Sequence, residues 1–387
     1  MRPLTYTRPK VMLPIANKPI LEHLMLEVRK AGIEEIVLIV GYHNETIRDY
    51  FEDGKRWGLK IQYATQMKQL GTAHALETVQ QFISDSFILL NGDILVGAED
   101  IRRLLEKDGT VLSLVEVANP EGLGVVEVEG DRVARIVEKA TSPPSNLVNA
   151  GLYLLTADIF PAIAQTPQSP RGEYELTSSL QLLADSGCHI SYQQLSYWLD
   201  VSYPWDLLTA NESLSARIEP QKLGTVEENV VLKGLVAVGE GTTIRANSYI
   251  AGPVVIGANC EIGPNCYIRA ASCIGDNCHI GSAVEVKNSI VMRNSKIPHH
   301  NYIGDSVIGE GCNFGAGTKI ANLRLDKDNI SAASVDTGRH KLGAIIGDDV
   351  QTGINASINV GSLIGDHTYI GPGAIASGLI LPDSRIF

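Results

Sequence analysis

Two aspartates in the first half of the sequence have surroundings typical of metal ligands. Asp93 ends the run FILLNGD and Asp200 ends the run YWLD, so we expect each carboxylate at the end of an apolar strand. If both strands end at one edge of a sheet, the carboxylates converge and would suit Mg²⁺, which takes oxygen ligands and bridges phosphates. The simpler interpretation is that each is a solvated loop carboxylate, and spacing alone favours it.

Other polar residues in this half occupy positions where strands end or helices begin. Gly71, in QMKQLGTA, begins a predicted helix, where backbone N–H groups can face a base or phosphate, although a single glycine is more often a plain turn. Lys10 adds a cation, and Glu138-Lys139 and Asn149 add polar groups after predicted strands. These residue types could hold an anionic ligand.

A histidine pair marks the second half. His299 could act as a general base, because imidazole titrates near neutral pH. Glu285 lies fourteen residues earlier and could orient the ring from a neighbouring level of the repeat described below. A loop histidine is, however, usually just solvated, and the adjacent His300 leaves open which imidazole would act.

The elements that would position the first group alternate between helix and strand. The apolar pattern predicts a helix from Ile20 to Val28 and a strand from Ile36 to Val40. The run from Phe87 to Leu90 predicts a central parallel strand that displays Asp93 at its carboxyl edge. Further strands are predicted at 111–117, 125–128 and 152–155, and helices at 176–185 and 204–215. We therefore expect a three-layer α/β domain that ends near residue 217.

Beyond residue 228 the apolar residues recur every six positions. One unbroken series is Leu232, Val238, Ile244, Ile250, Ile256, Ile262, Ile268, Ile274, Ile280, Val286 and Met292, and a second is Ile346, Thr352, Ile358, Ile364, Ile370 and Ala376. Hexapeptide repetition predicts a parallel β-helix, although spacing alone does not set its handedness. The repeat breaks between residues 293 and 345, where polar side chains gather. Loops on a rigid coil are where chemistry would be placed.

The repeat also explains most of the six cysteines. Those that lie four residues after an apolar anchor, where small side chains point inward, are Cys260, Cys266, Cys278 and Cys312. A free cysteine in such a position behaves as a small buried hydrophobe. No CxxC pair and no matching histidine spacing indicates zinc.

Amino-acid composition and net charge limit the kinds of molecule that the protein could bind. The chain of 387 residues is long enough for two cores, and 44% hydrophobic with 20% charged residues is typical of a folded globular protein. A net charge of -12 argues against nucleic acid and anionic membranes as partners, while a small anionic substrate could still be held by local cations. No apolar run approaches the length of about 18 to 20 residues that a membrane helix needs, and no signal peptide begins the chain, so we expect a cytoplasmic protein.

Several ordered motifs resemble the sugar-1-phosphate nucleotidylyltransferase family: RPKVMLPIANKPILEHL, QLGTAHAL, LLNGD, IVEKA, VNAGLYLL and WLDVSYPWDLLTANE. The repeats with KIPHHNYIGDSVIGEGCNFGAGTKIANL resemble the acetyltransferase half of the bifunctional N-acetylglucosamine-1-phosphate uridylyltransferase/glucosamine-1-phosphate acetyltransferase, most closely its archaeal type. The resemblance implies a Rossmann-like nucleotidyltransferase domain over 1–217, a linker at 218–228 and a left-handed β-helix acetyltransferase domain over 229–387.

For the first domain the resemblance implies a set of site residues. Gln66 and Gly71 would contact the nucleotide base, with Thr72 beside them, and Lys10 would act at the phosphates. Asp93 and Asp200 would hold Mg²⁺. The residues that would bind the sugar phosphate are Gly124, Glu138, Lys139 and Asn149. The bound sugar phosphate would attack the α-phosphorus of UTP or dTTP and expel pyrophosphate.

For the second domain the resemblance makes His299 the catalytic base of acetyl transfer and Glu285 its acidic partner. The residues that would bind glucosamine-1-phosphate are Arg269, Lys287, Tyr302, Asn313 and Asn322. Ala316 and Lys341 would lie at the acetyl-CoA pocket. The family also implies homotrimers with coenzyme pockets between subunits. The sequence departs from it at His300, at a long insert over 323–340, and at Ile354, and the last two bear on coenzyme contacts.

The N-terminus departs from the family as well. Relatives begin with an apolar strand and a loop of the form LAAGxGTR, and Met1 matches the residue that follows this loop. Without that phosphate cradle we expect little nucleotidyl transfer, and a mis-set start is the favoured explanation. A regulatory subunit that binds sugar nucleotides is the alternative, although it would not need His299 and its neighbours. A β-helix zinc hydratase is a weaker one, because adjacent histidines suit a single metal poorly.

Overall fold

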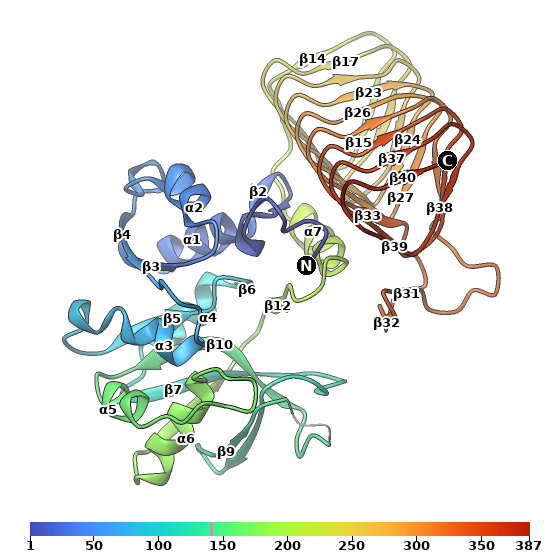
Figure 1. Ribbon diagram of the computed structural model, residues 1–387. Coiled ribbons are helices and arrows are strands. Elements are labelled where there is room, and N and C mark those ends of the chain that lie inside the picture. The colour runs from blue at the N-terminus through green and yellow to red at the C-terminus, as the bar shows by residue number, and fades with distance from the viewer. Residues whose placement is uncertain (140–141) are drawn as a thin grey trace. The chain divides into compact units, whose positions relative to one another are not determined.

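The computed structural model describes residues 1–139 and 142–387 (Figure 1). Its contacts divide the chain into two compact units. The first, called the α/β unit below, is Ile20–Asp200. The second, called the β-helix unit, joins Met1–Pro19 to Val201–Phe387. The β-helix begins at β13 (Gln221–Lys222), inside the stretch expected to be a linker.

The α/β unit is built on a six-stranded sheet with the strand order β5-β10-β7-β11-β9-β8. The strands are β5 (Phe87–Leu90), β7 (Thr110–Glu116), β8 (Val125–Glu129), β9 (Arg132–Val137), β10 (Leu147–Leu155) and β11 (Ile190–Gln194). β5 lies at the edge of this sheet and pairs antiparallel with β10, so the prediction of a central parallel strand is wrong. An apolar run predicts burial, whereas the direction and number of its neighbours depend on segments far away in the sequence.

Two smaller sheets complete this unit. β3 (Glu35–Val40) pairs in parallel with β4 (Lys60–Thr65), and β6 (Ile94–Val96) pairs antiparallel with β12 (Trp198–Asp200). The helices are α1 (Ile20–Lys30), α2 (Asn44–Phe51), α3 (Thr72–Glu77), α4 (Ala98–Leu105), α5 (Ile159–Ala164) and α6 (Leu176–Asp185). α1 buries Leu21, Leu24 and Val28 at helical spacing, as its pattern predicts. The predicted elements of this half are thus present, with ends shifted by a few residues.

The second half is a parallel β-helix of three sheets (Figure 1). They run from β13 to β39 (Leu379–Ile380), from β14 (Thr225–Val226) to β40 (Arg385–Ile386), and from β15 (Val231–Lys233) to β38 (Ile375–Ala376). Ile244 pairs with Ile262 and Ile262 with Ile280, so one coil takes three hexapeptides, and these side chains are buried. The fold predicted from the repeat is therefore confirmed. The four cysteines assigned to the interior are buried there, and burial raises the pKa of the Cys266 thiol to about 11.

Two irregularities interrupt the repeat. Ile274 pairs with Val291, and Val291 belongs to the interior, so the prediction that Met292 continues the inward series is wrong. This coil and the next one, in which Val291 pairs with Ile308, are each one residue shorter than the coils before them, which shifts the register. Further on, Lys319 pairs with Ser357 because the intervening insert leaves the coil as a hairpin of β31 (Ser331–Ala332) and β32 (Val335–Asp336).

The N-terminal segment and α7 (Asp206–Ser215) belong to the β-helix unit because they pack on the outside of its first sheet. Asn17 donates from Nδ2 to the carbonyl of Ile274 (2.6 Å), and its Oδ1 accepts from the Cys273 thiol (2.8 Å). Asn211 of α7 donates to the carbonyl of Ala271 (2.7 Å) and accepts from the Ala16 amide (2.9 Å). The bonds of Ala16 and Asn17 join residues about two hundred or more positions apart in the sequence, and the bond from Asn211 to Ala271 spans 60 positions.

Arg8 anchors this segment through buried ion pairs. Its side chain is buried, and its guanidinium forms ion pairs with Asp348 and, from Nη1 at 3.0 Å, with Glu310 Oε1. Thr7 Oγ1 donates to the same Asp348 carboxylate at 2.7 Å. The Asp348 Oδ1 atom accepts the Glu310 backbone N–H at 2.8 Å. A buried charge is stable only when it is paired in this way.

Candidate active sites

A pocket of about 160 Å³ in the α/β unit brings together four of the predicted residues, Gly124, Glu138, Asn149 and Asp200. The sheet register explains three of them. Val125, the first residue of β8, pairs with Val137 on one side and Val148 on the other, so the residues next to these pairs meet. The Asn149 amide donates to the Gly124 carbonyl at 2.8 Å. A Cβ at Gly124 would lie 2.9 Å from Glu138 Oε2, so a larger residue there would displace the carboxylate.

The polar groups of this pocket are held by short contacts. Burial, followed by repulsion from Glu175, raises the pKa of Glu138. Asn149 donates from Nδ2 to the hydroxyl of Tyr153 at 2.6 Å, and burial raises the pKa of Tyr153 to about 12. The Asn149 carboxamide is therefore fixed, with its Oδ1 accepting the Gly151 amide at 3.2 Å. Such a pocket offers fixed polar groups to a hydroxylated ligand.

Sequence reasoning missed Asn91 and Trp198, which also line this pocket. The Trp198 indole donates to the Ala150 carbonyl at 2.8 Å, which sets the ring against the pocket. Asn91 lies inside the motif LLNGD, and a Cβ at Gly151 would lie 2.6 Å from its Nδ2 atom. The position of Asn91 between a strand and Asp93 was the signal that could have identified it.

Asp93 and Asp200 lie on neighbouring strands. Asp200 pairs with Ile94, and Asp93 is the residue directly before Ile94, so the two aspartates are near neighbours along the chain and across the strand pair. The described residues contain no group of three or more His, Cys, Asp or Glu side chains that could hold a metal. Two carboxylates nevertheless fit Mg²⁺, because this ion commonly takes one or two protein carboxylates and completes its shell with phosphates and water.

The predicted nucleotide residues lie where α3 begins. Gln66 donates from Nε2 to the Gly71 carbonyl at 3.0 Å, and Thr72 Oγ1 accepts the amide of Leu176 at 2.9 Å. Gly71 has φ of +112°, and a Cβ there would lie 2.5 Å from the carbonyl oxygen of Tyr174. The turn is therefore specific to glycine.

Two predicted cations lie outside the pocket. Lys139 is exposed and adopts φ of +49°, and its backbone amide donates to the Leu123 carbonyl at 3.1 Å. Lys10 lies on η1 (Lys10–Met12), in the β-helix unit, whereas the pocket belongs to the α/β unit.

In the β-helix unit the predicted sugar-binding residues come together on successive coils. Arg269 pairs with Glu285 (Nη1 to Oε1, 2.8 Å), and Glu285 stacks in register beside Tyr302. Asn322 donates to the Tyr302 hydroxyl at 3.1 Å. Burial raises the pKa of Tyr302, so its hydroxyl keeps its proton at neutral pH.

Asp305 is the residue that sequence reasoning missed here. It is buried and accepts hydrogen bonds from Lys287 Nζ (2.6 Å), from Asn288 Nδ2 (2.9 Å) and from Asn322. It therefore fixes two of the predicted ligand-binding side chains. Its place directly after the apolar YIG segment resembles that of Asp93 after FILL and could have identified it.

His299 lies at the end of β26 (Lys296–His299), on the neighbouring sheet, and is exposed. The corner His300-Asn301 separates it from Tyr302, and His300 adopts φ of +50°. Among the described residues the Glu285 carboxylate contacts Arg269 and makes no hydrogen bond to His299.

The remaining predicted residues spread over the surface. Asn313 is exposed on β29 (Asn313–Phe314), in register with Lys296. The Ala316 carbonyl accepts the amide of Asn355 at 2.8 Å. Lys341 is exposed and bridges Leu323, where the insert leaves and rejoins the coil. No cluster of coenzyme-binding side chains is formed by these three residues alone.

Comparisons with known proteins agree with both units. The nucleotidyl transferase family model matches residues 1–217, and the model for the C-terminal domain of GMPPB matches residues 250–360. The structure of a putative glucose-1-phosphate thymidylyltransferase from Bacillus anthracis, in complex with a sucrose, is 28% identical, with a TM-score of 0.52, and covers 57% of this chain and 92% of its own. The fold and the pocket thus define a nucleotidyltransferase joined to a hexapeptide β-helix.

Relatives that contain both a nucleotidyltransferase and an acetyltransferase part match this chain over nearly their whole length. The bifunctional protein GlmU of Methanococcus maripaludis (strain C7) is 46% identical over all of this chain and 93% of the relative. A bifunctional sugar-1-phosphate nucleotidylyltransferase/acetyltransferase of Sulfurisphaera tokodaii is 40% identical over 97% of this chain and 94% of the relative. This chain belongs to the family of bifunctional sugar-1-phosphate nucleotidylyltransferases/acetyltransferases and is a transferase. Within the described residues, no helix is long and apolar enough to cross a membrane.

Proposed function

We propose that the chain acetylates glucosamine-1-phosphate with acetyl-CoA and transfers a nucleotidyl group from UTP or dTTP to a sugar-1-phosphate, so that the product is UDP-N-acetylglucosamine or a related nucleotide sugar. The observation that carries the first reaction is the stacking of Arg269, Lys287, Tyr302 and Asn322 on successive coils, where Glu285 holds Arg269 and Asp305 holds Lys287 and Asn322. Two cations and two neutral donors on one face suit a phosphate and the hydroxyl groups of a sugar.

In acetyl transfer, the amine nitrogen of the sugar attacks the thioester carbonyl, the carbon–sulfur bond breaks and the thiolate of coenzyme A leaves. His299 takes the proton that the nitrogen loses, because a neutral imidazole at the coil corner can accept it from the attacking amine. Ala316 and Lys341 would border the coenzyme. Asn313, one coil beyond Lys296 on the sheet that carries His299, would contact the sugar phosphate.

In nucleotidyl transfer, a phosphate oxygen of the sugar-1-phosphate attacks the α-phosphorus and pyrophosphate leaves. Gly124, Glu138 and Asn149 would orient the sugar in the pocket, with Lys139 beside Glu138. Gln66, Gly71 and Thr72 would contact the base, and Lys10 would act at the phosphates. Asp93 and Asp200 would hold Mg²⁺, which supplies neutralisation of the phosphate charge.

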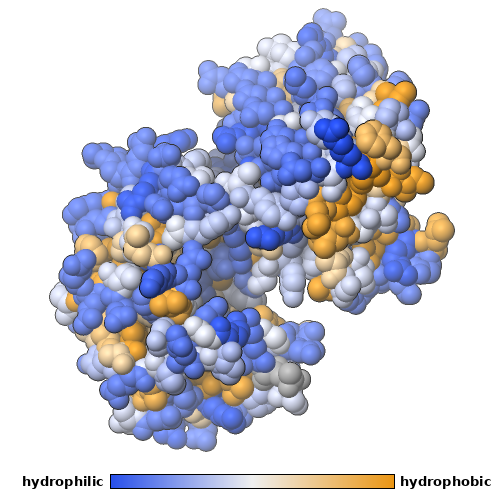
Figure 2. Space-filling model, viewed as in Figure 1, coloured by the Kyte–Doolittle hydropathy of each residue, from blue (hydrophilic) through white to orange (hydrophobic). Residues whose placement is uncertain are grey.

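A homotrimer with coenzyme pockets between subunits accompanies this proposal. Apolar side chains gather on the β-helix in Figure 2. Two exposed apolar residues of this unit are Ile375 (71% exposed) and Leu379 (62%). Contiguous exposed apolar area of this kind is typical of association surfaces. Sedimentation equilibrium of the full chain tests the trimer.

Release of free thiol from acetyl-CoA in the presence of glucosamine-1-phosphate tests the acetyl transfer. His299→Ala should abolish it, whereas His300→Ala, the matched control one residue away, should retain it. Unchanged turnover in His299→Ala would remove the base assignment. Pyrophosphate release from UTP tests the second reaction, and Asn149→Ala should lower it without changing thiol release.

A further inference from the structure

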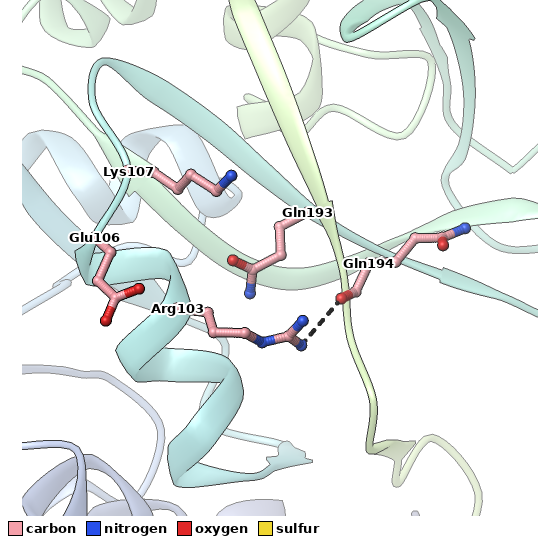
Figure 3. A pocket seen from close by; sticks show the side chains of 5 residues that line it. All are labelled: Arg103, Glu106, Lys107, Gln193 and Gln194. Atoms are coloured by element: carbon pink, nitrogen blue, oxygen red, sulfur yellow. Dashed lines mark hydrogen bonds between the residues drawn. The ribbon is translucent and has the colours of Figure 1, made fainter.

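A cavity in the α/β unit is separate from both proposed sites. It has a volume of about 440 Å³ and lies in the α/β unit, between the end of α4 and the end of β11 (Figure 3). Its lining residues are Arg103, Glu106, Lys107, Gln193 and Gln194, and none of them lines the pocket around Gly124. Cavities that bind small metabolites commonly have volumes of about 300 to 1,000 Å³.

A buried carboxamide faces this cavity with one atom unpaired. Gln193 is 7% exposed, and its Nε2 atom donates to the Asp100 carbonyl at 2.9 Å. That bond sets the orientation of the carboxamide, and its Oε1 atom has no hydrogen-bond partner among the described residues. In Figure 3 the group points into the space between Lys107 and Arg103. A buried acceptor without a partner is costly, and a ligand that brings an O–H or N–H donor recovers that cost.

Two cations border the same space. Arg103 is held in place by the buried carboxylate of Asp100 and by the Gln194 carbonyl, to which its Nη2 atom donates at 3.3 Å. Asp100 is already bonded to the amide and hydroxyl of Ser196 (3.1 Å and 2.9 Å). The Arg103 guanidinium is therefore preorganised and keeps further N–H donors. Lys107 forms no ion pair with any described residue and adds a positive charge at the rim.

The required ligand has two features. An anionic group suits the donors of Arg103 and Lys107, and a hydroxyl or amino donor suits Gln193 Oε1. Glu106 can accept from a second hydroxyl at the rim. Because Arg103 and Lys107 lie on the helix side of the cavity and Gln193 on the strand side, one compact molecule can contact all of them (Figure 3).

We propose that this cavity is a second binding site for a small phosphorylated sugar, with its phosphate at Arg103 and Lys107 and a sugar hydroxyl donating to Gln193 Oε1. The inference does not rest on the proposed reactions, because it follows from the chemistry of the lining residues. Occupancy of this second site would then depend on the concentration of sugar phosphates, independently of the sugar pocket around Gly124.

Calorimetric titration of the full chain with glucose 6-phosphate tests the site, and inorganic phosphate is the matched probe without hydroxyl groups on a sugar. Both titrations are done on the Asn149→Ala variant, so that the pocket around Gly124 is weakened. Lys107→Gln and Gln193→Leu should each lower the affinity for glucose 6-phosphate about tenfold or more, since each removes one polar contact. Gln193→Leu should leave the affinity for phosphate nearly unchanged.

Lys107 is exposed, so Lys107→Gln is expected to fold. If Gln193→Leu does not fold, Lys107→Gln alone still tests the proposal. Glu129→Gln, a charge change on the distant strand β8, is the control and should leave binding unchanged. Equal affinity for glucose 6-phosphate in Lys107→Gln and the parent protein would overturn the proposal. Absence of binding at millimolar concentration, or equal affinities for glucose 6-phosphate and phosphate, would overturn it as well, because water or any anion would then satisfy the cavity. If the protein without substitutions showed neither thiol release nor pyrophosphate release, but glucose 6-phosphate still bound, that result would count against the proposed reactions alone.

Discussion

Replacing Arg8 by methionine should destabilise the β-helix unit strongly, although Arg8 itself lies outside any helix or strand. The substitution keeps an unbranched apolar stem but removes the charge that pairs with Asp348 and Glu310. Both the Arg8 and the Asp348 side chain are at least nine-tenths buried, so the carboxylate would be left in the interior without its cation. Removal of one partner from a buried pair costs about 3 to 5 kcal/mol.

The lower end of this range is expected here. Thr7 and the Glu310 amide still donate to Asp348 in the variant, so part of the carboxylate solvation survives. We therefore expect a loss of about 3 kcal/mol in the free energy of unfolding. Arg293→Met is the matched control, because Arg293 also pairs with Glu310 (2.8 Å) but is 63% exposed. A pair of this exposure contributes about 0 to 1 kcal/mol.

Urea unfolding and hydrogen exchange measure the two variants. The Glu310 amide reports locally, since it donates to Asp348 Oδ1, and its exchange should accelerate in Arg8→Met more than in Arg293→Met. Adding Asp348→Asn to Arg8→Met should recover part of the stability, because it removes the unpaired charge and keeps an acceptor for the amide. Equal losses in Arg8→Met and Arg293→Met would refute the reasoning that burial decides the contribution of this pair.

Three further predictions concern single positions. Gly71→Ala should lower the melting temperature far more than Gly122→Ala, because a Cβ at Gly71 meets the Tyr174 backbone at 2.5 Å, whereas Gly122 also has positive φ but open space around it. Burial raises the pKa of Asp366 above its usual 3.8, so the folded state binds this proton more tightly than the unfolded state, and stability falls as the pH rises through the raised pKa. The urea midpoint of Asp366→Asn, measured from acidic to neutral pH, should lack this decline. An unchanged pH dependence in the variant would contradict the prediction. Asp305→Asn should raise the KM for glucosamine-1-phosphate about tenfold with less effect on kcat, because Lys287 loses its partner; a loss confined to kcat would contradict a positioning role.

The β-helix could be predicted from the sequence because its coil repeats one local rule. Every sixth residue points into the interior and every eighteenth fills the same column, so the spacing alone predicts that Ile244, Ile262 and Ile280 stack. The rule failed at Met292 because a coil shortened by one residue leaves the apolar spacing intact while it changes which side chain points inward. Such a deletion shows only in the pairing of neighbouring coils.

The α/β unit was less predictable, since its pocket depends on sheet order. The pocket residues Gly124, Glu138 and Asn149 meet because β8 pairs with both β9 and β10. No local sequence pattern indicates which two strands will pair with a third. Asp305 was missed for a related reason, since its donors come from coils before and after it. Local sequence could not predict the ion pairs of Arg8, because its partners Glu310 and Asp348 lie about three hundred positions later.

Because the β-helix unit starts before the α/β unit and resumes after it, the ribosome makes Arg8 before the whole α/β unit and its partner Asp348 after it. The segment that carries Arg8 therefore cannot pack on the β-helix until the whole of Ile20–Asp200 and the coils that follow have been synthesised. The α/β unit is in effect an inserted domain, and the two segments of the β-helix unit that flank it in the sequence are joined, since the Ala16 amide bonds to Asn211. A ligated chain in which Pro19 leads directly into Val201 should therefore still complete the coil, and co-expressed fragments divided at this boundary should reassemble through the N-terminal segment.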